Sequence, residues 1–179
     1  LEAPRRDTNR VVLPPASYVH EKEKIEKRWP AAVKFIKDRG MNEFVPGDIG
    51  VVGIIVQGGM YNGTLRALQG LGLADVWGTS RIPLYVLNVT YPLVPDEVAE
   101  FCRDKRAVLL VEEGQPDFIE QALSKILRQA GIHTPLSGKD LFPMAGEYTA
   151  AVMGDAIGAF VRQWVPDLSL IHISEPTRP

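Results

Sequence analysis

The chain has 179 residues, 45% of them hydrophobic and 23% charged, which fits one globular domain with a short appendage. Twenty basic against 22 acidic residues give a net charge of −2, so no basic excess is present to neutralise nucleic-acid phosphates. A single cysteine, Cys102, excludes an internal disulfide, a cysteine zinc site and an iron–sulfur cluster ligated by this chain alone. Since the apolar runs are shorter than a membrane span, we expect a cytoplasmic protein without nucleic-acid or membrane partners.

Residues 1–45 are predicted to form a linker, which consists of an extended arm followed by a charged helix. Residues 21–28 alternate acidic and basic side chains, which favours an exposed helix with ion pairs on one face. Pro30 suits the first turn of a second helix, which Gly40 would end. The apolar side chains expected to dock this second helix are Val33, Phe35 and Ile36.

Residues 46–167 predict an α/β domain. Short runs rich in valine, isoleucine and leucine predict buried parallel strands, at residues 49–56, 84–89 and 107–111. Apolar side chains at helical spacing predict helices at residues 64–71, 95–102, 116–130 and 148–165, with a short edge strand within 132–137. This alternation is typical of a doubly wound, three-layer fold with a mostly parallel sheet.

Residues 168–179 are similar, over nearly the whole stretch, to the translated sequence of a transposase adapter used in sequencing libraries. We interpret this tail as adapter-derived and leave it out of the fold. On this interpretation the natural protein continues past Asp167; the alternative is a natural polar tail.

Three glycines, Gly58, Gly59 and Gly63, follow a predicted strand and precede a predicted helix, where a phosphate-binding turn would lie. Their spacing is not G-x-G-x-x-G, and the lysine and hydroxyl of a Walker A loop are absent. A tight turn that only glycine tolerates is therefore the favoured interpretation. His20 and His133 match no metal-ligand spacing, so the sequence predicts no metal site.

Polar side chains follow two of the predicted strands. Glu112 and Glu113 follow the third strand, at the edge where open α/β sheets bind ligands, and could act as a general base or polarise a cofactor nitrogen. The favoured alternative is that one glutamate caps the helix opening at Pro116 and the other faces solvent. Thr90 and Tyr91 follow the second strand and reach the same edge, or pack within their loop.

Five strings along the chain share their order and spacing with a known family. They are Gln57-Gly58-Gly59-Met60-Tyr61-Asn62, Thr90-Tyr91-Pro92-Leu93, Val111-Glu112-Glu113, Gly138-Lys139-Asp140-Leu141-Phe142-Pro143 and Gly146-Glu147. Together they resemble the transketolase-C-terminal-like domain of indolepyruvate ferredoxin oxidoreductases, most closely the long form in which the alpha and beta parts are fused. The resemblance runs from about Arg10 to Asp167.

The resemblance implies a parent enzyme that oxidatively decarboxylates an aryl 2-oxo acid such as indolepyruvate. It implies thiamine diphosphate with Mg²⁺, transfer of the acyl group to coenzyme A, and electron flow through iron–sulfur clusters to ferredoxin. In the family the glycine–aspartate–glycine thiamine motif and the cluster cysteines lie in other domains, so no cofactor is expected wholly within this chain. The resemblance therefore implies a scaffold domain that contacts other domains or subunits.

Five residues are candidates for reaching a neighbouring site, and none is expected to be catalytic: Tyr61, Thr90, Tyr91, Glu112 and Glu113. Two alternatives remain open at this stage. One is the same domain of another thiamine diphosphate enzyme, of transketolase or 2-oxo acid dehydrogenase type. The other is a flavodoxin-like module that binds a small ligand at the glycine turn and has no catalytic role.

Overall fold

The structure is a computed structural model that describes residues 13–170. Its elements, in chain order, are α1 (Ala16–Glu23), η1 (Lys24–Arg28), α2 (Trp29–Asp38), β1 (Glu43–Val45), β2 (Val52–Gln57), η2 (Gly58–Met60), α3 (Tyr61–Gly70), β3 (Leu84–Leu87), α4 (Pro95–Cys102), β4 (Ala107–Val111), α5 (Phe118–Gln129), β5 (Leu136–Ser137) and α6 (Ala150–Trp164). The predicted tail falls mostly outside the described residues, as does most of the predicted arm, and both stay predictions.

A five-stranded sheet in the order β1-β3-β2-β4-β5 forms the centre of the molecule. Strands β2, β3, β4 and β5 are parallel, and β1 alone runs antiparallel, with Glu43 opposite Val86 and Val45 opposite Leu84. The predicted doubly wound, mostly parallel α/β fold is confirmed. Strand β1 falls within residues 1–45, so the sheet begins before the predicted domain start at residue 46.

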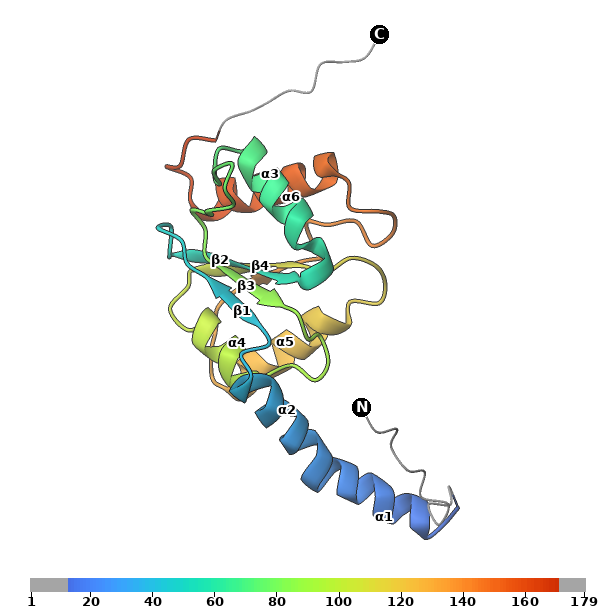
Figure 1. The fold of residues 1–179 in the computed structure, drawn as a ribbon. Helices are drawn as coiled ribbons and strands as arrows, with labels where there is room; N and C mark the ends of the chain where they lie inside the picture. The colour runs from blue at the N-terminus through green and yellow to red at the C-terminus, as the bar shows by residue number, and fades with distance from the viewer. Residues whose placement is uncertain (1–12, 171–179) are drawn as a thin grey trace.

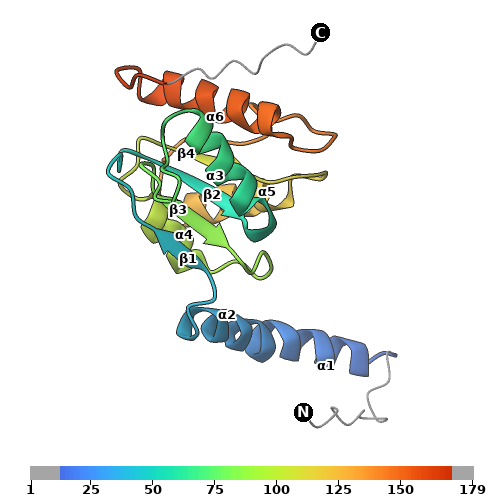
Figure 2. The ribbon, with the colours of Figure 1, turned by 45° about the horizontal axis from the view of Figure 1, so that its top comes forward.

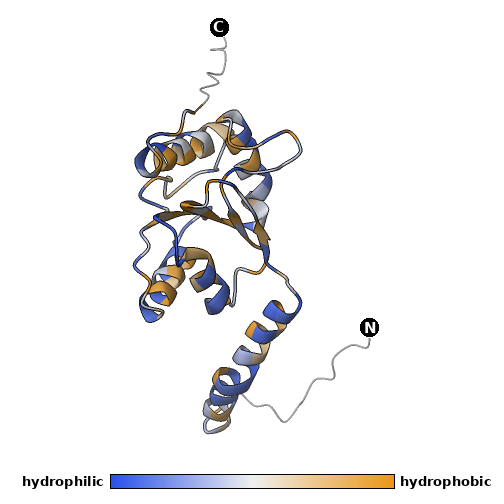
Figure 3. Ribbon diagram, turned by 90° about the vertical axis from the view of Figure 1, so that its left-hand side faces the viewer, coloured by the Kyte–Doolittle hydropathy of each residue, from blue (hydrophilic) through white to orange (hydrophobic). Residues whose placement is uncertain are grey.

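Helices cover both faces of the sheet, with α3 and α6 on one face and α4 and α5 on the other (Figures 1 and 2). Successive side chains of β4 alternate between the two layers: Leu109 packs with the α3/α6 side and Leu110 with the α4/α5 side. Both faces are lined by buried apolar side chains, and the residues of the central strands are coloured as hydrophobic in Figure 3. Burial on both faces explains why the sequence of each inner strand is a continuous apolar run.

Close approach of Phe101 and Lys105, at and just after the end of α4, favours glycine at one position inside strand β2. A Cβ atom built on Gly53 would lie 2.7 Å from Cζ of Phe101 and 2.7 Å from Cδ of Lys105. The Lys105 ammonium lies 4.8 Å from the centre of the Phe101 ring, so the two side chains fill the space above Gly53 together. The missing side chain lets the end of α4 pack directly on the sheet.

The N-terminal helix runs continuously through α1, η1 and α2, from Ala16 to Asp38, and projects from the body (Figures 1 and 2). Pro30 lies in the first turn of α2, as expected, but α2 continues directly from η1 without a break. The helical turn just before Pro30 is a π-turn, wider by one residue than an α-turn: the Trp29 N–H donates to the Lys24 carbonyl, five residues earlier. Pro30 has no N–H to donate to an earlier carbonyl, which is compatible with this wider turn. Ile36 is buried as expected, whereas Phe35 is 55% exposed. Gly40, with φ of +54°, ends the helix.

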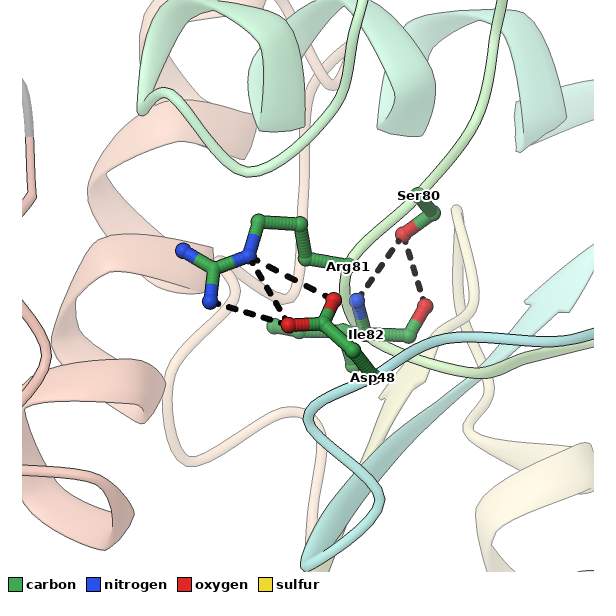
Figure 4. Close-up of polar contacts among 4 residues, drawn as sticks. All are labelled: Asp48, Ser80, Arg81 and Ile82. Carbon is green, nitrogen blue, oxygen red and sulfur yellow. Dashed lines mark hydrogen bonds and ion pairs between the residues drawn. The ribbon is translucent and has the colours of Figure 1, made fainter.

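The loop between α3 and β3 is fixed by polar contacts at its base. The Arg81 guanidinium donates to Asp48, with Nη2 3.0 Å from Oδ2, and the Ser80 hydroxyl donates to the Ile82 carbonyl at 2.6 Å (Figure 4). The Asp75 carboxylate accepts the Trp77 and Thr79 N–H groups at 2.9 and 2.8 Å, and the Thr79 N–H bond lowers the pKa of Asp75. These bonds hold a tight loop with Val76 and Trp77 at its tip.

Candidate functional site

A groove opens at the carboxyl ends of the parallel strands, between α2, α5 and the loops that follow β3 and β4. Its volume is about 890 Å³. We call it the edge groove. Its main apolar walls are Trp29, Tyr91, Leu93, Phe118, Ile119 and Ile126, and its polar lining includes Gln57, Thr90, Glu112, Glu113, Gln115 and Lys125. Crevices at this edge of an open α/β sheet are the usual ligand and contact sites of such folds.

Aromatic side chains stand at the mouth of the edge groove. Tyr91 is 77% exposed, and its ring meets Trp29 edge-on, with centroids 4.9 Å apart. Phe118, at the start of α5, is 67% exposed. Tyr91 follows β3 and Trp29 belongs to the projecting helix, so their ring contact joins that helix to the carboxyl edge of the sheet.

Glu112 caps helix α5. Its two carboxylate oxygens accept the Ile119 N–H at 2.9 Å and the Glu120 N–H at 3.1 Å. The carboxylate thus satisfies two free donors of the first turn and places a negative charge at the positive end of the helix dipole. The favoured interpretation of one glutamate as a cap is confirmed, although the helix opens at Phe118 rather than at Pro116.

Glu113 points toward the opposite layer. It is half-buried, so the expectation that the second glutamate faces solvent is wrong. Its carboxylate accepts the Tyr148 N–H at 2.8 Å, and its own N–H donates to the Gln57 side-chain carbonyl at 2.9 Å. The two adjacent glutamates at the end of β4 thereby bind to opposite layers of the fold. Glu112 binds the start of α5, and Glu113 binds the segment that leads into α6.

Lys139 lies behind the edge groove, and no role for it is predicted from the sequence. Its ammonium donates to the Glu112 carbonyl at 2.6 Å, to the Gly114 carbonyl at 2.7 Å and to the Tyr148 hydroxyl at 2.7 Å. These contacts join the loop after β4 to the loop before α6. The one signal for Lys139 was its place in the Gly138–Pro143 string, because the carbonyl acceptors leave no trace in the sequence.

Thr90 is exposed at the rim, and the loop that carries it is held from below. The Val89 N–H donates to Oδ1 of Asn42 at 3.1 Å, and Nδ2 of Asn42 donates to Oε2 of Glu97 at 3.0 Å. The Tyr85 hydroxyl donates to the same Glu97 oxygen at 2.7 Å. Burial, together with this contact to Glu97, raises the pKa of Tyr85 well above its usual range.

Tyr61 lies apart from the other four candidates. It begins α3 and packs against the core on the α3/α6 side, whereas Thr90, Tyr91, Glu112 and Glu113 all line the edge groove. The structure therefore brings four of the five candidates together and leaves Tyr61, half-buried, against the core on the α3/α6 side. The sequence could not separate them, since all five follow strand ends.

The glycine turn has a different cause from the one expected. Gly58 and Gly59 do not adopt positive φ values, so the turn does not depend on glycine's backbone freedom. A Cβ on Gly58 would instead lie 2.8 Å from Oδ1 of Asn88, while Gly59 has open space around it. A side chain at position 58 would have to displace the Asn88 side-chain oxygen, so the close approach of Asn88 favours glycine there.

The described residues offer no ligand set for a metal ion held by three side chains or for an iron–sulfur cluster. Within residues 13–170, no group of three histidine, cysteine, aspartate or glutamate side chains is placed to hold a metal ion. Cys102 is buried, and desolvation raises its pKa to about 12, which disfavours the thiolate that ligates iron. Both Glu112 oxygens already accept N–H groups. No helix between residues 13 and 170 is long and apolar enough to cross a membrane.

Comparison with known proteins finds relatives of one kind. No family model matches the chain. It is 26% identical over 156 residues to indolepyruvate oxidoreductase subunit IorA of Methanothermobacter thermautotrophicus, an alignment of 86% of this chain and 24% of the relative. It is 31% identical to IorA of Methanothermobacter marburgensis over 82% of this chain and 23% of the relative. With IorA of Thermococcus kodakarensis it shares 31% identity over 62% of this chain.

The chain thus spans about a quarter of the length of the two Methanothermobacter relatives. The alignments cover 86% and 82% of this chain, so the similarity is not confined to one motif. By sequence, the chain belongs to the indolepyruvate ferredoxin oxidoreductase family.

Proposed function

We propose that this chain is a structural domain of an oxidoreductase and that it contacts other domains or subunits of the same enzyme. One observation carries the proposal. At the carboxyl edge of the sheet, Glu112, Glu113 and Lys139 are engaged in holding loops, while Tyr91 and Phe118 beside them are exposed. Exposed aromatic side chains above a fixed polar frame are typical of a contact surface.

We propose that the parent enzyme is cytoplasmic and oxidatively decarboxylates an aryl 2-oxo acid. Coenzyme A is the acyl acceptor and ferredoxin is the electron acceptor. The names of the relatives support an oxidoreductase and indolepyruvate as its substrate. The family resemblance supplies the rest: thiamine diphosphate with Mg²⁺ as the decarboxylating group, and iron–sulfur clusters, all bound by other domains. The role of this chain is then to orient its neighbours.

A second exposed apolar surface lies at the amino ends of the parallel strands, on the loop that leads into β3. Val76 and Trp77 are 83% and 89% exposed at the tip of the loop that Asp75 closes. A rigid loop loses little conformational entropy on binding, and tryptophan is enriched among the residues that dominate interface energies. We propose that this loop inserts into another domain of the parent enzyme.

The test is a chimera in which this chain replaces the aligned 155-residue part of the Methanothermobacter marburgensis relative. We expect the chimera, supplied with the partner subunits of that enzyme, to reduce an electron-accepting dye in an indolepyruvate-dependent reaction. We also expect no binding of thiamine diphosphate with Mg²⁺ to the 179-residue chain alone in calorimetry, and binding to the assembled chimera. A relative with the aligned part deleted serves as the control and should be inactive.

Two results would contradict the proposal. Thiamine diphosphate binding by the isolated chain, as tight as binding by the assembled chimera, would place the cofactor site in this domain. A chimera that assembles and binds thiamine diphosphate but cannot reduce the dye would show that the domain does not serve the reaction.

A further inference from the structure

We infer that a small pocket beside the edge groove binds the ammonium group of a primary amine. We call it the switch pocket; its polar and glycine lining is Gln57, Gly58, Gly59, Asn88, Thr90 and Glu113. Gln57, Thr90 and Glu113 also line the edge groove, so the two cavities adjoin. The volume of the switch pocket is about 560 Å³, which suits a small organic molecule better than a bare ion. The inference goes beyond the proposed function and does not depend on it.

The switch pocket lies where the connections of the sheet change direction. After β2 the chain crosses through α3 to β3 on one side, and after β4 it crosses through α5 to β5 on the other side. Helices α3 and α5 cover opposite faces of the sheet (Figure 1). Gln57 ends β2 and Glu113 follows β4, and the 2.9 Å bond between them lies at this point. Open α/β sheets bind their ligands where the topology switches in this way.

Glu113 supplies the charge of the switch pocket. Among the described residues of its lining, Glu113 is the only charged one. Its Oε1 accepts the Tyr148 N–H, whereas its Oε2 has neither a hydrogen-bond donor nor an ion-pair partner within residues 13–170. The Lys139 ammonium already serves three other acceptors. A half-buried carboxylate with a free oxygen attracts a cation and repels an anion, so the ligand should carry a positive charge.

Two further side-chain oxygens of the lining are free. Nδ2 of Asn88 donates to the Met41 carbonyl at 3.1 Å and to Oε1 of Glu43 at 2.7 Å, which leaves Oδ1 as the atom toward the glycine turn. In the described part of the chain, neither this Oδ1 nor the exposed Thr90 hydroxyl has a hydrogen-bond partner. An ammonium group donates three hydrogen bonds and accepts none. Glu113, Asn88 and Thr90 therefore match it in number and in kind.

Gly59 leaves room for a ligand beside the backbone. It belongs to η2, which continues directly into α3, and glycine is unfavourable within a helix. Its φ is not positive, and a Cβ atom built on it meets nothing within 4 Å, so neither backbone conformation nor packing requires glycine there. Glycine is typical of positions where a ligand approaches the backbone closely.

The ammonium group can belong to a free small molecule or to a lysine side chain of another domain of the parent enzyme. The test starts with the isolated 179-residue chain, isotope-labelled and titrated with n-butylamine at neutral pH, where the amine is charged. We expect the Gly58 and Gly59 amide resonances to shift and to saturate, with a Kd of about 1–10 mM. Butanol and butyrate, which carry no charge and a negative charge, should cause no saturable shift.

Two variants of the lining sharpen the test. Glu113→Gln keeps an acceptor for the Tyr148 N–H and removes the charge, so it should weaken amine binding at least tenfold. Gly59→Leu should also weaken binding at least tenfold, because the new side chain takes up room in the pocket. It should keep the fold, which circular dichroism checks, because a Cβ at this position has open space. The matched control is Glu100→Gln, at an exposed carboxylate of α4 outside the lining, and should bind the amine unchanged.

Three results would overturn the inference. The first is no saturable shift at up to about 100 mM n-butylamine. The second is binding that both Glu113→Gln and Gly59→Leu leave unchanged. The third is butanol binding as tight as amine binding.

The same titration of the assembled chimera identifies the source of the ammonium group. Amine binding that persists in the chimera indicates a free small molecule, and amine binding that is lost there indicates a lysine of a neighbouring domain. The isolated chain alone decides whether the switch pocket binds an ammonium group. Its titration is independent of thiamine diphosphate binding and dye reduction, so its failure is distinguishable from failure of the proposed function.

Discussion

The two faces of the sheet are built on different principles. Beneath α3 and α6 the core centres on fully buried apolar side chains such as Leu68 and Phe160. Beneath α4 and α5 the core also encloses groups that can lose or carry a proton, namely Tyr85, Glu97 and Cys102. The first face needs only the right volume. The second also needs hydrogen-bond partners, and through Asn42 it holds the loop that shapes the edge groove.

The largest effect is expected on the apolar face. Phe160→Ala removes a fully buried ring from α6 and leaves a cavity that the packed layers can fill only in part, so the free energy of unfolding should fall by about 3–5 kcal/mol. Urea denaturation measures the loss. Phe35→Ala, at a 55% exposed position, is the control and should change the unfolding free energy by less than about 0.5 kcal/mol. Equal losses would contradict the assignment of the core.

On the polar face, Tyr85→Phe keeps the ring volume and removes one hydroxyl. Glu97 then loses its 2.7 Å hydrogen bond and keeps only the donor from Asn42, inside the core. We expect the free energy of unfolding to fall by about 1–3 kcal/mol, measured in urea. Tyr18→Phe, at an exposed tyrosine, is the control. If Tyr85→Phe leaves the free energy of unfolding unchanged, the hydrogen bonds among Asn42, Tyr85 and Glu97 do not stabilise this face.

Alkaline pH should weaken the polar face selectively. Burial raises the pKa of Cys102 from 9.0 to about 12 and raises that of Tyr85, so the native state holds protons that the unfolded chain releases. This stability is present below the unfolded pKa values and is lost as pH rises from about 9 toward 12, by up to about 1.4 kcal/mol per pH unit for each proton. Urea midpoints across this range measure the slope. Cys102→Ala should make the fall of the urea midpoint with pH shallower. An unchanged fall would show that the Cys102 thiol does not contribute to the loss of stability at alkaline pH.

The smallest effect is expected where the two layers meet. Glu112→Gln keeps one acceptor for the first turn of α5 but removes the negative charge from its N-terminus, and should cost about 1 kcal/mol. Glu147→Gln, at an exposed glutamate in the loop before α6, is the control. Thermal unfolding distinguishes the two variants. If both behave alike, Glu112 is not the cap.

The order of strands and helices was predictable because both faces of the sheet are buried, and a strand buried on both sides is a continuous apolar run. Strand β1 was not predictable for the opposite reason. It has three residues, of which Glu43 and Phe44 are exposed, so its pairing with β3 leaves no apolar pattern. The continuous N-terminal helix was missed because Pro30 is as compatible with a widened turn as with a helix start.

The site was predictable as a place but not as a set of contacts. Position at strand ends was enough to bring Thr90, Tyr91, Glu112 and Glu113 to one edge. The role of Lys139 could not be predicted, because two of its three acceptors are main-chain carbonyls whose positions depend on the folded loops. Trp29 was missed as well, since only the direction of the projecting helix brings it to Tyr91.

Gly53 has a consequence for how sequences of this domain can diverge. The space that its missing side chain leaves is filled jointly by Phe101 and Lys105. We therefore expect a larger residue at position 53 to occur together with a smaller residue at position 101 or 105. Homologous sequences should record this pairing as covariation between strand β2 and the end of α4, positions about 50 residues apart in the chain.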